Sequence, residues 1–285
     1  MTQIKAGVKK EWLFFWRSFR FGGMAIGFAV AALMGPVLIR LVLAMRGIYE
    51  ETLGAEAAAE MFAELEGANG LFASYASTLE MFAVPFMPPM MFVVITLLIG
   101  GMCGGEQKRR SIIIPQTAGL TPFGYVLPKF IMFPPLVWVM TVLAALTANG
   151  ACQLLLGASL PVEIVFVTGS LTGLSLMFLV CMYMFFGISL AQPKLSILFV
   201  LAANAVFPWI SMTFSIDRFT PWSLGGMNAL VIWNYTSGNA YYDGIGGANI
   251  VITALITLAL CAVFVVGTYF TLVAKRMDNT ADEVY

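Results

Sequence analysis

The chain has 285 residues, of which 60% are hydrophobic and only 11% are charged, and its 15 basic and 15 acidic residues cancel to a formal net charge of zero. A soluble domain carries roughly 25% charged residues, so much of this surface must face lipid. The chain has no histidine, which excludes His-based metal sites and Ser–His catalysis, and it has no P-loop for binding ATP. We therefore expect no enzyme activity, no cofactor and no metal in this chain.

Six apolar runs are long enough to span a bilayer, which takes about 20 residues. They lie at 22–45, 81–103, 128–150, 163–190, 195–214 and 249–274. The sequence thus predicts an all-α, polytopic membrane protein that forms a single transmembrane domain over residues 1–285. We expect no cleaved signal peptide, because the first run is too long for one.

The segment before the first run, residues 3–20, has the pattern of an amphipathic helix. It places Ile4, Val8, Trp12, Phe15 and Phe19 on one helical stripe, while most of its basic residues, Arg17 among them, lie elsewhere. This pattern predicts a helix lying on the inner leaflet. The alternative is a basic anchor that only flanks the first span.

Residues 46–80 are rich in Ala and Glu, and we expect them to form an external loop. Glu56, Glu60 and Glu64 recur every four residues, which indicates a short helix in this loop. A solvated helix face explains these acids, and attraction of a cationic substrate is the alternative.

Residues 104–127 are predicted to form a structured cytosolic loop. Its charges cluster at the start, an apolar stretch from Ile112 to Ile114 follows, and Thr121-Pro122 is typical of the start of a further helix. Such a mixed, ordered loop indicates a docking element. A loop that merely supplies positive charge for membrane topology is the alternative.

Residues 215–248 are predicted to form a re-entrant or interfacial hairpin on the outer side. The stretch from Leu224 to Ile232 is apolar but too short to span, and Trp222, Trp233 and Tyr235 bracket it. Irregular backbone at membrane depth survives only where protein or a cavity surrounds it. We therefore interpret Trp222, Trp233 and Tyr235 as an external gate.

Charge sets the predicted orientation. Twelve of the 15 basic residues fall on the side that holds both chain ends and the 104–127 loop, whereas ten of the 15 acids fall on the other side. The positive-inside rule makes the basic side cytosolic. Both termini then lie in the cytosol, which requires an even number of spans.

The predicted spans carry almost no ionisable residues, which disfavours proton coupling through a buried carboxylate. They do carry small-xxx-small pairs, among them Gly23/Gly27 and Gly169/Gly173, that permit close helix approach. Any energy for transport must therefore come from a partner.

The whole layout resembles the permease subunit of ABC-2 type transporters, the type V ABC transporter fold. In that family an acidic residue, basic residues, an apolar stretch, Thr-Pro and a Lys on the next helix mark the coupling region. The corresponding residues here are Glu106, Lys108, Arg109, Arg110, Ser111, Thr121, Pro122 and Lys129, with Arg110-Ser111 where Gly-Thr is usual.

The resemblance implies several further properties. The N-terminal segment with Trp12, Phe15, Arg17 and Phe19 becomes an elbow helix, and the 104–127 loop docks on a cytosolic ATPase subunit that binds ATP and Mg²⁺. A second permease subunit completes an exporter in a bacterial cell membrane, with no nucleic acid as partner. A secondary transporter or channel, and a scaffold or sensor subunit that moves nothing, remain alternatives.

Overall fold

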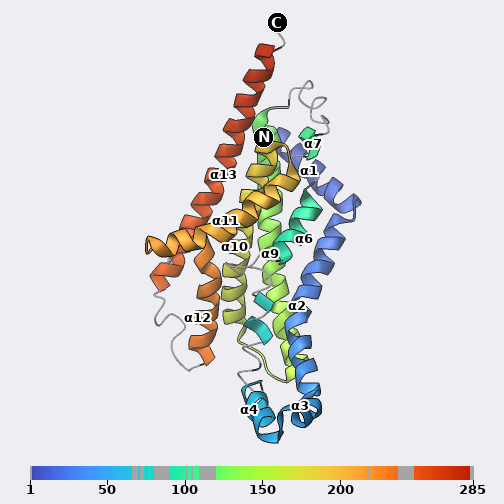
Figure 1. Ribbon diagram of the computed structural model, residues 1–285. Coiled ribbons are helices and arrows are strands. Elements are labelled where there is room, and N and C mark those ends of the chain that lie inside the picture. The colour runs from blue at the N-terminus through green and yellow to red at the C-terminus, as the bar shows by residue number, and fades with distance from the viewer. Residues whose placement is uncertain are drawn as a thin grey trace.

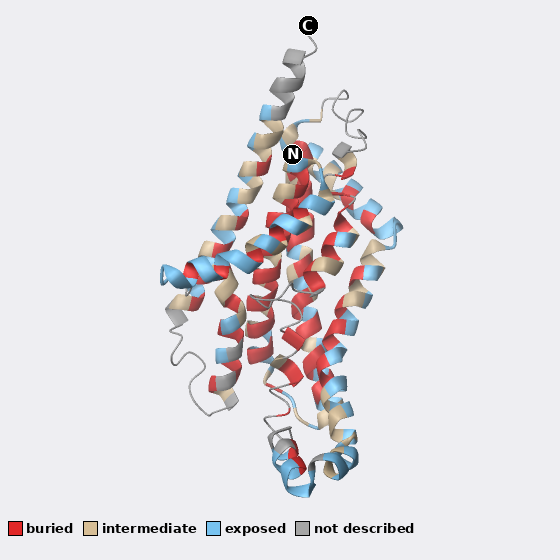
Figure 2. Cartoon of the chain, viewed as in Figure 1, coloured by how far each residue is buried: buried red, intermediate tan, exposed pale blue. Residues whose placement is uncertain are grey.

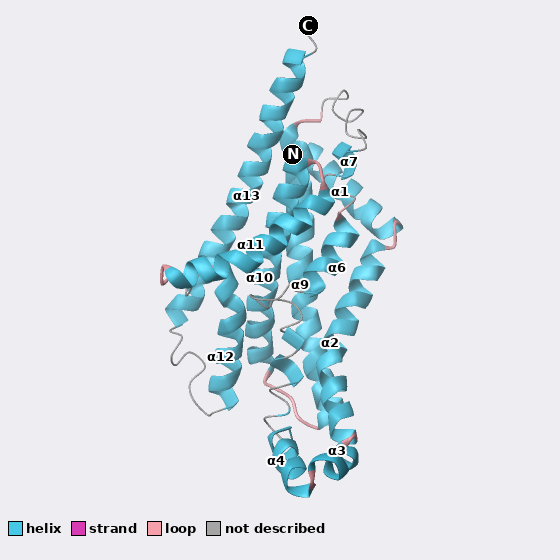
Figure 3. Ribbon diagram, in the orientation of Figure 1, coloured by secondary structure: helices cyan, strands magenta, loops and turns pink. Residues whose placement is uncertain are grey.

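The computed structural model describes residues 2–65, 70, 74–76, 78–79, 90–100, 102–103, 105–108, 120–216, 219–236 and 247–282. Within these residues the protein is helical and contains no strand (Figure 3). The prediction of an all-helical, polytopic chain is therefore confirmed for the part that the structure describes.

The helices form one elongated bundle (Figure 1). Helix α1, helix α7 and the last turns of α13 lie at one end, called here the α1 end, and α3 and α4 lie at the opposite end, the α4 end. The elements are α1 (Thr2–Arg17), α2 (Arg20–Ala44), α3 (Arg46–Leu53), α4 (Ala55–Leu65), α6 (Met90–Ile99), α7 (Gly105–Lys108), α9 (Pro122–Leu156), α10 (Val162–Leu190), α11 (Pro193–Thr213), the 3-10 helix η2 (Pro221–Ser223), α12 (Leu224–Thr236) and α13 (Gly247–Asp282).

Five of the described helices are long and apolar enough to cross a membrane: α2, α9, α10, α11 and residues 249–274 of α13. The run expected at 81–103 is described only from residue 90 onward, apart from Gly101, and contains the ten-residue helix α6. Because α2 ends near the α4 end and α9 begins at the α1 end, the chain must return between them, and α6 lies on that path (Figure 1). A sixth span there stays a prediction.

Helix α9 begins where the sequence indicated a helix start. The Thr121 hydroxyl accepts a hydrogen bond from the Gly124 amide at 3.0 Å, and Pro122 occupies the first helical position, where its missing N–H costs nothing. The helix runs for 35 residues to a left-handed Gly157, so it extends beyond both ends of the expected 128–150 span.

Helix α10 is the central helix of the bundle. In its most apolar stretch 83% of the residues are buried, compared with 28% or less in α2, α11 and α13 (Figure 2). Its Gly169 and Gly173 lie against α9: a Cβ on Gly169 would come within 2.8 Å of the Ala145 Cβ. This small-xxx-small pair therefore serves packing within the chain.

The elements that follow α10 pack along different parts of it. Phe199 of α11 stacks on Phe186, near the end of α10, with 5.5 Å between ring centroids. Trp222 of η2 meets Phe178, halfway along α10, at 5.2 Å, and α12 lies beside the earlier part of α10 (Figure 1). Helix α11 ends at Thr213, Ser215 after it has a left-handed conformation, and η2 brings the chain back to the middle of α10.

One expectation about the external loop is wrong. The sequence predicted a loop over residues 46–80; α4 does form a helix there, but Tyr75 is fully buried inside the bundle. The Tyr75 hydroxyl lies 2.9 Å from the Thr168 hydroxyl of α10, and the Ser74 hydroxyl lies 3.3 Å from Cys152 Sγ of α9. These bonds satisfy the hydroxyl groups of Ser74 and Tyr75, which can therefore be buried.

The close approach of α9 and α10 yields a stability prediction. A Cβ on Gly173 would lie 2.9 Å from Trp138 Cδ1 and 3.2 Å from the Trp138 carbonyl oxygen, and the backbone oxygen cannot move aside. We expect Gly173→Ala to destabilise the purified protein by about 1–3 kcal/mol through overpacking. Gly150→Ala is the matched control, because nothing lies within 4 Å of the added Cβ. Equal apparent melting temperatures of the two variants in detergent would contradict this packing.

Candidate functional site: a buried ion-pair cluster

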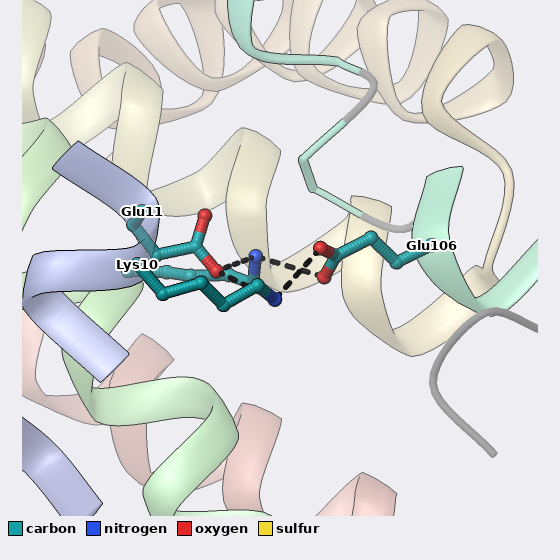
Figure 4. A network of polar contacts seen from close by, with 4 residues as sticks. Lys10, Glu11 and Glu106 are labelled. Atoms are coloured by element: carbon teal, nitrogen blue, oxygen red, sulfur yellow. Dashed lines mark hydrogen bonds and ion pairs between the residues drawn. The ribbon is translucent and has the colours of Figure 1, made fainter. Parts of the chain in front are cut away.

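Four charged side chains from three separate elements meet at the α1 end of the bundle (Figure 4). The Lys129 ammonium lies 2.7 Å from Glu11 Oε1 and 3.0 Å from Glu106 Oε2. Lys10 Nζ lies 3.0 Å from Glu106 Oε1 and 3.5 Å from Glu11 Oε1. We call these four residues the ion cluster; with two ammonium groups and two carboxylates it is electrically neutral.

Lys129 is the centre of the ion cluster and is fully buried. It lies about two turns into α9, and its ammonium also sits 4.9 Å from the centre of the Tyr125 ring, one turn earlier. A buried ammonium without carboxylates would be very costly, so Lys129 requires both acids. The ion cluster thereby ties α1 and α7 to the start of α9.

The face of α1 that reaches α9 follows from residues spaced four apart. Gly7, Glu11 and Phe15 lie on one side of the helix, and α1 approaches so closely that a Cβ on Gly7 would overlap the Pro128 ring. Glu11 and Phe15 are buried, and the Phe15 ring meets Phe133 of α9 at 5.5 Å. A carboxylate can take part in this interface because Lys129 neutralises it.

Glu106 is held in its charged form. Burial alone would raise the pKa of its carboxyl group, but the positive charges of Lys129 and Lys10, with their hydrogen bonds, hold that pKa below the usual value for glutamate. Glu106 is the second residue of α7, at the entrance of the 104–127 loop. The loop entrance is therefore fixed to α1 and α9 by charge.

The exit of the same loop is also tied to α1. The Thr121 hydroxyl, which caps α9, donates a hydrogen bond to Gln3 Oε1 at 3.2 Å. Helix α1 thus contacts the loop at both ends, through Lys10 and Glu106 at the entrance and through Gln3 and Thr121 at the exit. A force on the loop would be felt by α1 and by the first turns of α9.

The structure describes part of the predicted coupling set. It places Glu106 in the ion cluster, Lys108 at the end of α7, and Thr121 and Pro122 at the start of α9. Arg109, Arg110 and Ser111 lie outside the described residues. Within this set, Glu106 and Lys129, which lie 23 positions apart in the sequence, form an ion pair.

The residues of the predicted stripe on the N-terminal segment have different environments, and its placement on the inner leaflet stays a prediction. Phe15 is buried against α9, but Trp12 and Phe19 are 40% and 86% exposed, and Arg17 is exposed too. The stripe was predicted from apolar residues alone, whereas the face of α1 that packs against α9 includes Glu11. Sequence reasoning missed Lys10 and Glu11; the signal for Glu11 was a single acid on a basic helix, four residues from both Gly7 and Phe15.

The three residues interpreted as an external gate lie on η2 and α12. Trp222 is sandwiched between Phe178 and Phe207, at 5.2 and 5.3 Å, and Tyr235 packs against the core. Trp233 belongs to α12, but its side chain is outside the described part. Near them the Asn228 amide of α12 donates a hydrogen bond to the Thr172 hydroxyl of α10. These contacts fasten α12 to the central helix.

The described residues hold no group of three or more His, Cys, Asp or Glu side chains that could bind a metal ion. All four cysteines are free and buried.

No known protein family, curated protein or solved structure matches this chain. The resemblance to ABC-2 permeases therefore stays a prediction from the sequence.

Removal of the Lys129 ammonium should strongly destabilise the fold. Lys129→Met leaves the buried Glu11 and the partly buried Glu106 with only the exposed Lys10 to neutralise two carboxylates. Breaking a buried pair in this way costs about 3–5 kcal/mol. We expect a large drop in the apparent melting temperature of the detergent-purified protein. Lys194→Met, an exposed lysine at the start of α11, is the control and should change little. Similar losses for both variants would show that the ion cluster does not stabilise the fold.

The pKa of Glu106 predicts a pH window. A depressed pKa in the folded state contributes stability that is complete above the unfolded value, about 4.3, and is lost as pH falls through the folded value. The wild type should therefore melt above Glu106→Gln by a constant margin between about pH 5 and pH 8. That margin should shrink below about pH 4.3. A margin that grows on acidification would contradict the assignment.

Proposed function

We propose that this chain is the membrane subunit of an ATP-driven transport system of the ABC-2 type, an exporter powered by a separate cytosolic ATPase subunit. The observation that carries the proposal is that α1 holds both ends of the 104–127 loop, through Glu106 and through Thr121. A loop that only supplied positive charge for topology would need no such fixation. A loop that transmits force to the membrane helices would need it.

The path of the force can be followed through the contacts. Motion of the 104–127 loop would act on the ion cluster and on the first turn of α9, and α9 packs closely on the central helix α10 through Gly169 and Gly173. Because packed helices shift as rigid bodies, a small displacement at the loop would move α10 and with it α12. The Trp222 contacts and the Asn228–Thr172 bond then become the outer closure of the pathway.

The source of energy follows from what the spans contain. Lys129 apart, the described membrane helices offer no charged side chain that is buried in the bundle, and Lys129 is fully paired with carboxylates. Proton-driven transport usually relies on such groups. Work must therefore enter from outside the membrane, and the basic side with the 104–127 loop is the side that we assign to the cytosol.

A second membrane subunit and the bilayer would cover the outer faces. Helices α11 and α13 present large apolar side chains such as Trp209 and Phe270, which are 65% and 62% exposed (Figure 2). In the proposed assembly these faces contact lipid or a second copy of the chain or a homologue. Both chain ends lie in the cytosol of a bacterial cell.

Co-purification with an ATPase tests the proposal. The full-length chain, solubilised from its native membrane, should retain a P-loop ATPase whose activity rises when the complex is reconstituted with transported substrate. Scrambling residues 109–119, which leaves Glu106 and Thr121 in place, should abolish this association. Scrambling residues 55–65 of α4 at the opposite end should not.

Three results separate the alternatives. Retention of the ATPase after scrambling 109–119 would refute docking through the loop. Absence of any ATPase from the wild-type preparation would favour a secondary transporter or channel. An associated ATPase that no substrate stimulates would favour a scaffold or sensor.

A further inference from the structure

The outward face of α1 and the corner between α1 and α2 carry exposed aromatic and basic side chains together. The aromatic members are Trp12, Phe14, Trp16 and Phe19, which are 40–86% exposed. The basic members are Lys5, Lys9, Arg17 and Arg20, of which the first three are exposed and Arg20 is partly exposed. We call these eight residues the corner surface.

The aromatic part of the corner surface is an ordered platform. Trp12 and Trp16 stack at 6.0 Å between ring centroids, and Phe21 of α2 packs against both, at 5.7 Å from Trp12 and 5.0 Å from Trp16. Tryptophan rings favour the headgroup level of a bilayer, where one edge is apolar and the other is wet. The platform thus sets the depth at which the basic groups meet the membrane.

The corner itself pushes an aromatic ring outward. Phe19 adopts a left-handed conformation, with φ of 57°, which is strained for a bulky residue, and its side chain is 86% exposed. In water, both the strained backbone and the exposure of an apolar ring would be unfavourable. In a bilayer the ring inserts among acyl chains, which offsets the strain of the turn.

Among the described residues, no acid forms an ion pair with the basic members of the corner surface. The single acid of α1, Glu11, is turned inward and bound to Lys129, so it cannot neutralise the outward face. The Arg20 guanidinium lies 5.4 Å from the centre of the Phe14 ring; its Nη1 atom is buried and has no hydrogen-bond partner within the described part of the chain. The first turn of α2, which Arg20 opens, has no side-chain cap either. The corner surface therefore offers donors that lack an anionic partner.

We propose that the corner surface binds the headgroup of an anionic phospholipid, with the partly exposed Arg20 among the basic contacts to its phosphate. A guanidinium and a phosphate form short, charge-assisted hydrogen bonds, and the flanking basic residues favour a headgroup that carries no compensating ammonium. The aromatic platform and Phe19 hold the acyl chains beside it. This inference does not depend on the proposed transport function, because it concerns only α1, α2 and the bilayer.

Native mass spectrometry of the detergent-purified, full-length chain tests this inference directly. Titration with phosphatidylglycerol should give bound lipid at concentrations where phosphatidylcholine gives little. Arg20→Gln should weaken phosphatidylglycerol binding about fivefold, the usual effect of one basic residue at an anionic surface. Arg40→Gln is the matched control, because Arg40 is exposed near the other end of the same helix and should leave binding unchanged.

Other outcomes overturn the inference. Equal binding of the two lipids, or unchanged binding after Arg20→Gln, would show that the corner surface is a general membrane anchor. Displacement of the lipid by millimolar inorganic phosphate would indicate a small-anion site. If Arg20→Gln fails to fold, the triple variant of the exposed residues, Lys5→Gln, Lys9→Gln and Arg17→Gln, should weaken phosphatidylglycerol binding more than about fivefold relative to the wild type. Retained binding in that variant would equally refute the proposal.

Discussion

The Lys129 ammonium is buried at the point where three elements of the chain meet, and a charge in that position is tolerable only if carboxylates surround it. Glu11 and Glu106 supply those carboxylates from α1 and α7. A hydrophobic replacement of the whole ion cluster could be as stable, so its value lies in specificity. The charges fix which face of α1 meets α9 and where the 104–127 loop begins.

The other features of the α1 end follow from this arrangement. With Glu11 drawn inward, the outward face of α1 carries basic and aromatic side chains and no acid, which suits an anionic membrane surface. With Glu106 fixed, α7 cannot move without α1 and α9, and through Gly169 and Gly173 the contact continues to α10. The same charges that anchor the N-terminal helix thus tie the entrance of the loop to the bundle.

Much of the fold could be predicted, because helix ends and apolar runs are local properties. The Thr121-Pro122 start of α9 and the span at 163–190 are examples. The packed face of α1 could not be predicted, because a buried Glu11 is tolerable only through Lys129, which lies 118 positions away. The burial of Tyr75 and the packing of Trp222 against the middle of α10 likewise depend on partners distant in the sequence, Thr168 and Phe178.

The central claim is that Glu11 and Lys129 interact directly and that this contact docks α1 on the bundle. A double-mutant cycle with Glu11→Gln, Lys129→Met and the combined variant measures it through the free energy of unfolding in detergent. If the contact is direct, the combined variant should be more stable than the sum of the single losses predicts, by about 1–3 kcal/mol. Additivity within about 0.5 kcal/mol would contradict the account.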